Sequence, residues 1–270
     1  MDHRPKKRFG QNFLRDRSIL DKIIAAAELA PQSRVLEIGP GLGALTDLLL
    51  EEAGNLQVIE LDRDLVERFR QRNDPRLQIH EGDVLRLDWT AILTEPPYTL
   101  VANLPYNISS QVVFKLLDHH MLFERMVLMF QKEVADRLCA GPGNRDYGIL
   151  SVLCALYFDL EMVTRVAPGS FYPPPKVQSA VVAFTPLSAP RLPVGDEAFF
   201  RRVVKAAFAQ RRKTLRNTLG AGGFNAEVVR TALAEVGIDP TRRGETLDLK
   251  EFVSLAQALA TMQESADAGR

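Results

Sequence analysis

Between residue 34 and about residue 135, short apolar runs alternate with longer amphipathic stretches, and no other feature of the sequence constrains the fold more. Apolar runs of this length predict buried strands, and stretches with one apolar face predict the helices that connect parallel strands. The expected strands are residues 35–38, 57–61, 77–80, 100–102 and 127–130, and the expected crossover helices are residues 45–52, 64–72 and 110–117. This order predicts an α/β fold with a Rossmann-like, doubly wound and mostly parallel sheet.

A stretch with three prolines, residues 186–195, ends this pattern. Before it, we expect a helix over residues 149–158 and strands over 161–166 and 180–184. After it, we expect only helices, over residues 197–218, 226–236 and 249–262. Because 270 residues exceed a typical single domain, we predict two domains. Residues 1–188 contain the sheet, and residues 189–270 form a small all-helical domain.

Composition excludes several classes of protein. Hydrophobic residues make up 46% of the chain and charged residues 25%, which excludes a disordered chain and a disulfide scaffold. No apolar run reaches the eighteen or so residues of a membrane-spanning helix, and the amino terminus lacks the apolar stretch of a signal peptide. We therefore expect a cytoplasmic protein with no membrane partner. Cys139, Cys154 and the four histidines lack the spacing of metal ligands, so no metal site is expected.

A glycine-rich loop follows the first expected strand, with Gly39, Gly41 and Gly43 just before a helix. Glycine lets the backbone approach a ligand closely. The pattern differs from the Gly-x-Gly-x-x-Gly of dinucleotide enzymes, whose third glycine serves helix packing beside a pyrophosphate. The loop therefore favours a nucleoside cofactor without a pyrophosphate, such as S-adenosylmethionine. A plain strand-to-helix turn is the alternative interpretation.

Two carboxylates follow the next two strands. Glu60 lies twenty-one positions after Gly39, where it can accept hydrogen bonds from both ribose hydroxyls of a nucleoside. Asp83 follows the third strand and can accept from the adenine amino group of the cofactor. The alternative role of Asp83 is that of a turn or helix-cap carboxylate. With Gly39 and Gly41, these two side chains form the predicted cofactor site.

The fourth strand leads into Asn103, Leu104, Pro105 and Tyr106, a tetrad that suits an amine substrate. The N6 amine of adenine is a poor nucleophile, because its lone pair is delocalised into the ring. The Asn103 side-chain oxygen and the Leu104 carbonyl can accept its two N–H groups and so aim the lone pair at a methyl group, while Tyr106 offers a stacking face. Because a sulfonium donor becomes neutral as the nitrogen becomes cationic, positioning and acceptor dipoles matter more than a strong base.

Two proline-rich segments contain further aromatic residues. Residues 95–98, Glu-Pro-Pro-Tyr, resemble the acidic Pro-Pro-Tyr tetrads of amino methyltransferases. They precede their strand, whereas open sheets bind ligands at the carboxyl ends of strands, so we interpret them as a turn. Phe171 lies in the stiff loop 171–177 before the last strand, and we expect it to sandwich the target base against Tyr106. Packing of this loop onto the core is the alternative.

Thirty-four basic residues balance thirty-four acidic ones, so only the distribution of charge is informative. No acidic residue lies between Glu197 and Glu227. The basic residues of that segment are Arg201, Arg202, Lys205, Arg211, Arg212, Lys213 and Arg216, and those of the opening segment are Arg4, Lys6, Lys7, Arg8, Arg15 and Arg17. We expect Arg211, Arg212 and Lys213 to contact RNA phosphates. An ordinary solvated helix face is the alternative.

Together these motifs resemble the adenine dimethyltransferases of small-subunit ribosomal RNA, from residue 7 to about residue 255. The matching segments are residues 7–14, 37–43, 60–62, 103–107, 131–134, 171–177 and 210–214. The resemblance implies a class I methyltransferase fold. It also implies that Tyr106 and Phe171 handle the base, and that S-adenosylmethionine is contacted by Asn12, Leu14, Gly39, Glu60, Asp83 and Asn103.

The resemblance further implies an S-adenosylmethionine-dependent enzyme that transfers two methyl groups to each of two neighbouring adenosines near the 3′ end of 16S ribosomal RNA. Its partner is then the small ribosomal subunit, held by the helical RNA-binding domain, and a monomer is expected. Such a protein can also act in subunit assembly. Large-subunit methyltransferases that confer macrolide resistance are one alternative, but the proline-rich loop and residues 210–217 look more like the small-subunit enzymes. A non-catalytic assembly or transcription factor is the other; the intact glycine loop, Asn103 and Tyr106 argue against it.

Overall fold

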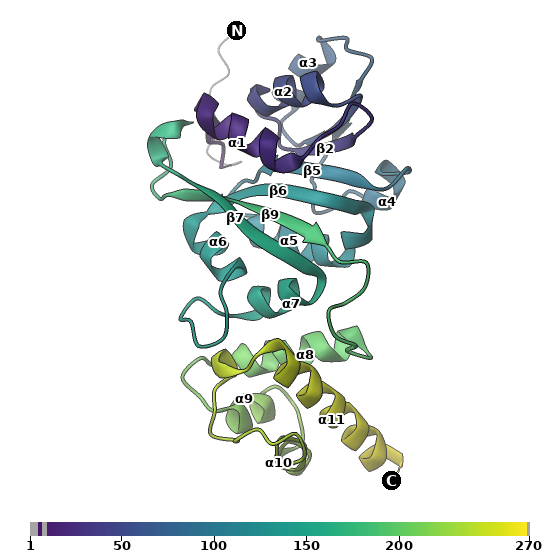
Figure 1. The fold of residues 1–270 in the computed structure, drawn as a ribbon, viewed down its shortest axis with the longest axis vertical. Helices are drawn as coiled ribbons and strands as arrows, with labels where there is room; N and C mark the ends of the chain where they lie inside the picture. Colours follow the sequence, from purple (N-terminus) through teal and green to yellow (C-terminus); the bar gives the residue numbers. More distant parts are fainter. Residues whose placement is uncertain (1–4, 7–9, 269–270) are drawn as a thin grey trace. The chain divides into compact units, whose positions relative to one another are not determined.

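The computed structural model describes residues 5–6 and 10–268, with side chains described up to residue 263. A seven-stranded sheet has the order β4-β3-β2-β5-β6-β9-β7 (Figure 1). Its strands are β2 (Arg34–Ile38), β3 (Asn55–Glu60), β4 (Leu77–Glu81), β5 (Tyr98–Asn103), β6 (Phe123–Gln131), β7 (Phe158–Val166) and β9 (Ser179–Pro186). The pairings from β4 to β6 are parallel, and β9 is antiparallel to both of its neighbours. The predicted doubly wound, mostly parallel sheet is confirmed.

A separate two-stranded sheet joins β1 (Phe13–Leu14) to β8 (Phe171–Tyr172) in antiparallel register. Phe13 pairs with Tyr172, and Leu14 pairs with Phe171. Directly paired residues share one face of such a ladder, so Leu14 and Phe171 lie on one face and Phe13 and Tyr172 on the other. Leu14 and Phe171 belong to the main hydrophobic cluster. The ladder therefore attaches the amino-terminal segment to the proline-rich loop.

Helices cover both faces of the large sheet (Figure 1). α1 (Arg17–Ala27), α2 (Ala44–Glu52) and α3 (Arg63–Arg70) lie on one face, and α4 (Trp89–Ile92) and α5 (Ser109–Asp118) lie on the other. Asp16 and Asp62 begin α1 and α3, because each carboxylate accepts a hydrogen bond from the amide two residues later. The three predicted crossover helices correspond to α2, α3 and α5, with ends that differ by at most two residues.

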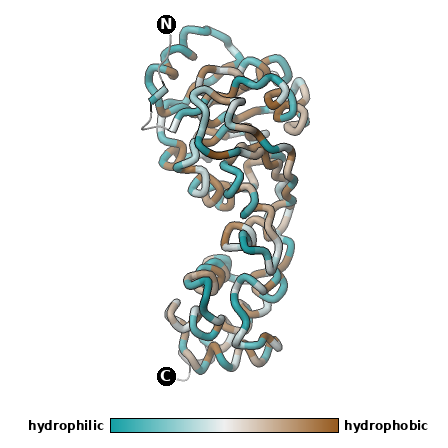
Figure 2. Tube along the Cα trace, turned by 90° about the vertical axis from the view of Figure 1, so that its left-hand side faces the viewer, coloured by the Kyte–Doolittle hydropathy of each residue, from teal (hydrophilic) through white to brown (hydrophobic). Residues whose placement is uncertain are grey.

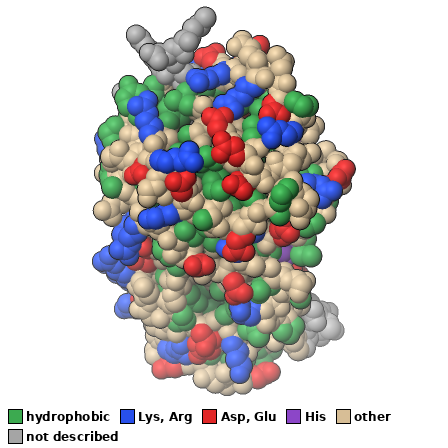
Figure 3. Space-filling model, turned by 45° about the horizontal axis from the view of Figure 1, so that its top comes forward, with side chains coloured by type: hydrophobic (Ala, Val, Ile, Leu, Met, Phe, Trp, Pro, Cys, Tyr) green, Lys and Arg blue, Asp and Glu red, His purple; other side chains and the backbone are tan. Residues whose placement is uncertain are grey.

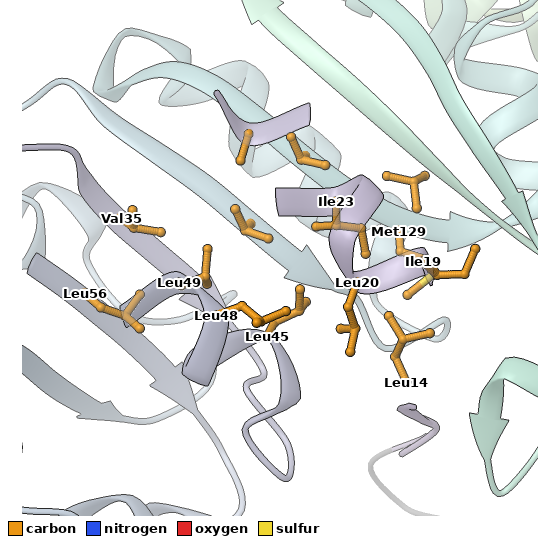
Figure 4. Close-up of a cluster of buried hydrophobic side chains, with 14 of the residues drawn as sticks. Leu14, Ile19, Leu20, Ile23, Val35, Leu45, Leu48, Leu49, Leu56 and Met129 are labelled. Atoms are coloured by element: carbon orange, nitrogen blue, oxygen red, sulfur yellow. The ribbon is translucent and has the colours of Figure 1, made fainter. Parts of the chain in front are cut away.

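Aliphatic side chains of α1 and α2 form the core on their face of the sheet (Figure 4). They recur at helical spacing and so form one apolar stripe on each helix. Figure 4 labels members of this cluster on both helices and on two strands of the sheet. They are Ile19, Leu20 and Ile23 of α1, Leu45, Leu48 and Leu49 of α2, Val35 of β2 and Leu56 of β3. Figure 2 shows hydrophobic and hydrophilic stretches alternating along the chain, with hydrophilic ones at many of the outer loops.

The chain forms two compact units. The first unit comprises the chain up to residue 136 together with residues 158–186, so it contains both sheets. The second comprises residues 137–157 and the chain from residue 187 onward. Its helices are α7 (Ile149–Tyr157), α8 (Glu197–Phe208), α9 (Leu215–Ala221), α10 (Ala226–Glu235) and α11 (Leu249–Ala268), and α6 (Lys132–Leu138) crosses from one unit to the other. Within the described part of the chain, no helix is long and apolar enough to cross a membrane.

The units differ from the expected domains in one segment. The last of the three crossings between the units, at residue 187, lies beside the expected boundary at residue 188, but residues 137–157 also belong to the helical unit. Hydrogen bonds explain this assignment. The amide of Leu187 donates to the carbonyl of Tyr157, and that of Arg191 donates to Leu156, both at 2.8 Å. The end of α7 is therefore tied to the proline-rich linker, a long-range contact that composition does not reveal.

The expected single helix over residues 197–218 is wrong, because the chain breaks between α8 and α9. The buried residues of α8 include Val204 and Ala207. A continuous helix would place Arg211 on this buried face, seven positions after Val204 and four after Ala207. The chain instead turns at residues 209–214, which leaves Arg211 exposed, and α9 buries Leu215.

Candidate active site

The chain order of the sheet reverses between β2 and β5. From β2 the chain moves outward to β3 and β4, and it then returns to β5 on the other side of β2. Open α/β sheets bind their ligands at the carboxyl ends of the strands beside such a switch point. A pocket of about 290 Å³ lies there. Among the residues that line it are Asn12, Gly39, Gly41, Glu60, Asp83, Asn103, Leu104, Pro105 and Tyr106.

The glycine loop reaches this pocket with two residues in the left-handed region of backbone conformation. The φ angle is +67° at Gly39 and +59° at Gly41, values that other residues rarely adopt. A Cβ atom at Gly41 would also lie 2.8 Å from Cδ1 of Phe13, too close for two carbon atoms. Gly41 is therefore required both by its own conformation and by the approach of Phe13, which lines the same pocket.

Glu60 is the last residue of β3, and only 8% of its surface is exposed. Its Oε1 accepts hydrogen bonds from the backbone N–H groups of Leu61 and Asp62, each at 2.8 Å. Burial raises the pKa of Glu60, and the backbone N–H groups oppose this shift. The chain immediately after β3 thus orients the carboxyl group at the pocket.

The amino-terminal segment contacts the start of α3, and no pattern in the sequence indicated this contact. The ammonium group of Lys6 forms ion pairs with Asp62 and Asp64, and Gln11 donates to Oδ2 of Asp62 at 3.0 Å. Burial raises the pKa of Asp62, but the hydrogen bonds from Lys6 and Gln11 outweigh it, so the net shift is downward. This cluster holds Gln11 and Asn12 at the pocket, which both of them line.

Asp83 lies two residues after β4 and has two roles. Its Oδ1 accepts from the amide of Leu85 at 2.9 Å, and its Oδ2 lies 3.6 Å from Nε of Arg86. These contacts make it a turn carboxylate, the alternative that the sequence left open. It also lines the pocket. The two roles are compatible, since a carboxylate has about four lone-pair positions.

The side chain of Asn103 is anchored by the other side of the pocket. Its Nδ2 donates to the backbone carbonyl of Asn12 at 2.9 Å, across 91 positions of sequence. This hydrogen bond fixes the plane of the amide group and leaves Oδ1 as its acceptor. Leu104, the next residue, is 1% exposed, and its amide donates to the carbonyl of Met129. The strand end is therefore rigid at the tetrad.

Tyr106 is held in a comparable way. Its hydroxyl group lies 2.5 Å from Oγ of Ser179, the first residue of β9, and Ser109 donates to its backbone carbonyl at 3.2 Å. Burial raises the pKa of Tyr106, so its phenol is neutral in the physiological range. Ser179 was not predicted. It lies two residues after the proline-rich loop 171–177, and that loop was the available signal.

Leu14 and Phe171 lie outside this pocket. Leu14 lines a neighbouring pocket of about 310 Å³ that shares Gly39, Gly41 and Asn103 with the first. Phe171 is 4% exposed and belongs to the core cluster, and it lines neither pocket. The register of β1 with β8 turns Phe171 to the core side of the ladder. The sandwich of the target base between Phe171 and Tyr106 stays a prediction.

The segment at residues 95–98 is structural, as interpreted from the sequence. Tyr98 begins β5, so it lies at the opposite end of the strand from Asn103. It is 2% exposed, and its hydroxyl accepts a hydrogen bond from Nε2 of Gln57 at 3.2 Å. A tyrosine held in this way packs the amino edge of the sheet.

No cysteine or histidine of the described residues lines the pocket. Cys154 is completely buried, and burial raises the pKa of its thiol, which keeps it protonated. Nε2 of His80 lies 3.0 Å from Oε1 of Gln57. Across residues 5–6 and 10–268, no three His, Cys, Asp or Glu residues are grouped so that they could hold a metal ion.

The basic residues predicted to bind RNA are exposed. Nε of Arg211 donates to Glu245 at 2.8 Å, so this guanidinium is partly neutralised, while Arg212 and Lys213 lie in the exposed turn between α8 and α9. In the opening segment, Arg15 and Arg17 are exposed and Lys6 is paired with Asp62. The remaining basic residues of that segment, Arg4, Lys7 and Arg8, lie outside the described residues.

The sheet order, the glycine loop after β2 and the tetrad at the end of β5 define a doubly wound methyltransferase. A narrower assignment follows from comparison with known proteins. The model of the family described as ribosomal RNA adenine dimethylase matches residues 2–261, and the chain belongs to this family. The membership that the motifs indicated is confirmed.

Curated relatives match almost the whole chain. The ribosomal RNA small subunit methyltransferase A of Syntrophotalea carbinolica is 64% identical, and the match covers 96% of this chain and 98% of that protein. The protein of the same name from Geobacter sulfurreducens is 54% identical, with 95% of each chain covered.

Solved structures also match. A dimethyladenosine transferase from Plasmodium falciparum has a TM-score of 0.80 and 29% identity, covering 93% of this chain and 98% of that chain. The 23S rRNA methyltransferase ErmE has a TM-score of 0.67 and 26% identity, covering 92% of this chain and 100% of that chain. Both matches extend well beyond residue 187, so they include the helical unit as well as the sheet.

Proposed function

We propose that this chain transfers methyl groups from S-adenosylmethionine to N6 of two adjacent adenosines near the 3′ end of 16S ribosomal RNA. One observation carries the proposal: the Asn103 to Tyr106 tetrad ends β5 in the same pocket as Gly39 and Glu60. A nucleoside cofactor site and an amine-acceptor site thus share one cavity. Membership of the adenine dimethylase family and the names of the most similar curated relatives support this substrate.

The residues present fit S-adenosylmethionine. Two adjoining pockets, which share Gly39, Gly41 and Asn103, offer room for both ends of a nucleoside joined to an amino acid. The bound cofactor supplies an electrophilic methyl group on a sulfonium. Glu60 accepts hydrogen bonds from the ribose hydroxyls and Asp83 from the adenine amino group, while Asn12 and Leu14 line the two pockets.

Asn103 and Leu104 act on the substrate amine. The Asn103 Oδ1 and the Leu104 carbonyl accept its two N–H groups, which directs the nitrogen lone pair at the methyl group. Because Asn12 already fixes the Asn103 amide, the acceptor needs little reorganisation as positive charge develops on the nitrogen. Tyr106 stacks on the target base, and Pro105 fixes the turn between the acceptors and this ring.

The two domains expected from the sequence then have separate tasks. We propose that residues 1–188 bind the cofactor and perform the transfer, and that residues 189–270 bind RNA through Arg211, Arg212 and Lys213. The partner is the small ribosomal subunit, the site of action is the cytoplasm, and the protein acts as a monomer. By staying bound to an immature small subunit, this protein also acts in subunit assembly.

Labelled methyl transfer tests the proposal. Small and large subunits lacking adenine dimethylation are incubated with the purified protein and labelled S-adenosylmethionine. We expect label on two neighbouring adenosines of the small-subunit RNA and none on the large subunit. Label on the large subunit alone would support the macrolide-resistance type of enzyme. Absence of label from both would support a non-catalytic RNA-binding factor.

A further inference from the structure

An exposed aromatic residue lies at the edge of the candidate site and has no role in the proposed chemistry. Tyr172 of β8 has 49% of its surface exposed, one of few large hydrophobic side chains in the described part of the chain to be so open. The guanidinium carbon of Arg15 lies over its ring, 4.1 Å from the ring centre. Arg15 is itself exposed and lines the second pocket. A flat cationic and aromatic surface therefore adjoins the site.

The register of the small ladder determines the direction of this surface. Tyr172 pairs with Phe13, and Phe13 lines both pockets. Paired residues share one face of a ladder, so Tyr172 lies on the face that carries this pocket-lining side chain. Phe171, one residue earlier, faces the core with Leu14. Tyr172 is therefore the aromatic residue of the proline-rich loop that remains available to a ligand.

The loop after Tyr172 adds a rigid, basic edge. Residues 173–175 are three prolines, and Lys176 and Val177 that follow are both exposed. Within the described side chains, neither Arg15 nor Lys176 forms an ion pair with a carboxylate. Arg17, by contrast, is paired with Asp21 at 2.8 Å. The surface thus combines stacking area with two cations whose charge is not neutralised.

We infer that Arg15 and Tyr172 form a stacking platform for the nucleotide next to the target adenosine, and that Lys176 contacts the RNA backbone beside it. The inference rests on the proposed function. When one adenosine leaves its stack to enter the pocket, the neighbouring base loses a stacking partner, which costs a few kcal/mol. Single-stranded RNA recovers such losses by stacking on aromatic rings and arginine planes. Two adjacent target adenosines make this compensation necessary at each transfer.

The experiment compares full-length variants in single-turnover methylation at increasing concentrations of unmethylated small subunits. Tyr172→Ala and Arg15→Ala should each raise the half-saturating subunit concentration at least about five-fold, the lower end of the effect of removing one base–aromatic stack. The double variant should show less than the product of the two effects, because the two side chains form one surface. Tyr172→Phe should resemble the wild type. Met121→Ala, which removes a side chain that is 63% exposed in η2 (His120–Leu122), is the matched control and should have no effect.

Two measurements separate the platform from a structural role. Cofactor affinity by calorimetry and the thermal unfolding midpoint should stay unchanged in Tyr172→Ala. An unchanged half-saturating concentration would overturn the inference. So would a loss explained by a lower unfolding midpoint or weaker cofactor binding, since the pair would then only stabilise the β1–β8 ladder.

A second probe keeps the inference testable if the wild type fails to methylate small subunits, a result that would overturn the proposed function itself. The probe is a short single-stranded RNA that carries 2-aminopurine, whose fluorescence falls on stacking. Quenching by the wild type that is lost in Tyr172→Ala would support the platform. Equal quenching by the two proteins would contradict it.

Discussion

Asn103 and Tyr106 are each held by a residue that is distant in the sequence. The Asn103 amide donates to the Asn12 carbonyl, and the Tyr106 hydroxyl is bonded to Ser179. Both groups are therefore oriented before any substrate arrives. Fixed acceptors stabilise developing charge more effectively than mobile ones, because they do not have to reorganise during the reaction.

The first prediction concerns the acceptor itself. Asn103→Ala should slow methyl transfer roughly 100-fold or more, the effect of removing one preorganised polar group from a transition state. RNA binding should remain largely intact, since the reacting amine is the only part of the RNA that this side chain is proposed to contact. Single-turnover rates and filter binding measure the two effects separately. Asn55→Ala, at the exposed amino end of β3, is the control. A near-normal rate in Asn103→Ala would refute the proposed chemistry.

The second prediction concerns the ribose contact. Glu60→Ala should weaken S-adenosylmethionine binding by roughly 1.5–3 kcal/mol, the scale of losing hydrogen bonds to a charged group. Because Oε1 of Glu60 also accepts from Leu61 and Asp62, Glu60→Gln serves as a second variant that retains an acceptor there. Calorimetric titration gives the affinity, and circular dichroism checks that both variants are folded. Unchanged affinity in the folded variants would remove Glu60 from the site.

Glu37 is a buried carboxyl group that the sequence analysis did not single out. It is 1% exposed, lines the second pocket and accepts a hydrogen bond from the Thr46 hydroxyl at 2.6 Å. Burial raises its pKa to about 8, although the Thr46 hydrogen bond opposes the shift. The folded protein therefore holds this proton at a pH where the unfolded chain releases it.

A third prediction follows for stability against pH. Below about pH 4.5, Glu37 is protonated in both states and costs nothing. As pH rises from there through about 8, the unfolded carboxyl ionises first, so the wild type loses stability relative to Glu37→Gln. The difference should grow by up to about 1.4 kcal/mol per pH unit in that window. Urea unfolding of both proteins at a series of pH values measures it. A constant difference would show that Glu37 has an ordinary pKa.

At the scale of helices and strands, the sequence predicted the elements whose signal is local. Apolar runs identified the strands from β2 to β6, and glycines and carboxylates identified the loops at their carboxyl ends. The break between α8 and α9 was not predicted. The expected helix was extended along the run of basic residues through Arg211, although the apolar spacing of α8 does not continue there. The register of β1 with β8, which directs Phe171 to the core, depends on the pairs Leu14–Phe171 and Phe13–Tyr172, which are 157 and 159 positions apart. No local pattern encodes such a pairing.

The fourth prediction belongs to the glycine loop. Gly41→Ala should weaken S-adenosylmethionine binding at least about tenfold, because a Cβ atom must displace Phe13 and a positive φ costs of order 1–3 kcal/mol. Gly195→Ala is the matched control. Gly195 has a similar φ of +69° but no atom within 4 Å of an added Cβ. It should lose some stability and keep its cofactor affinity. Equal cofactor affinity in the two variants would contradict the proposal that Gly41 is needed for cofactor binding.

At the scale of the whole molecule, the total charge is balanced, but basic and acidic residues are unevenly distributed along the sequence. Figure 3 shows basic and acidic side chains interspersed over the face turned to the viewer, without one large field of a single sign. Because the total charge is balanced, RNA must be attracted by local groups. The turn between α8 and α9 is such a place, because Arg212 and Lys213 are exposed there and only Arg211 has a carboxylate partner, Glu245, among the ion pairs of the described residues.

The last prediction tests this turn. Replacing Arg211, Arg212 and Lys213 by Ala should weaken subunit binding and lower the slope of log affinity against log salt concentration. The slope should fall by roughly 0.7–0.9 for each RNA phosphate that the variant no longer neutralises, as fewer counterions are released. Because Arg211 is partly neutralised by Glu245, Arg212→Ala with Lys213→Ala should account for most of the change. Cofactor affinity should not change, since the turn and the pocket belong to different compact units. Equal salt slopes for the wild type and the triple variant would mean that the turn is ordinary solvated surface.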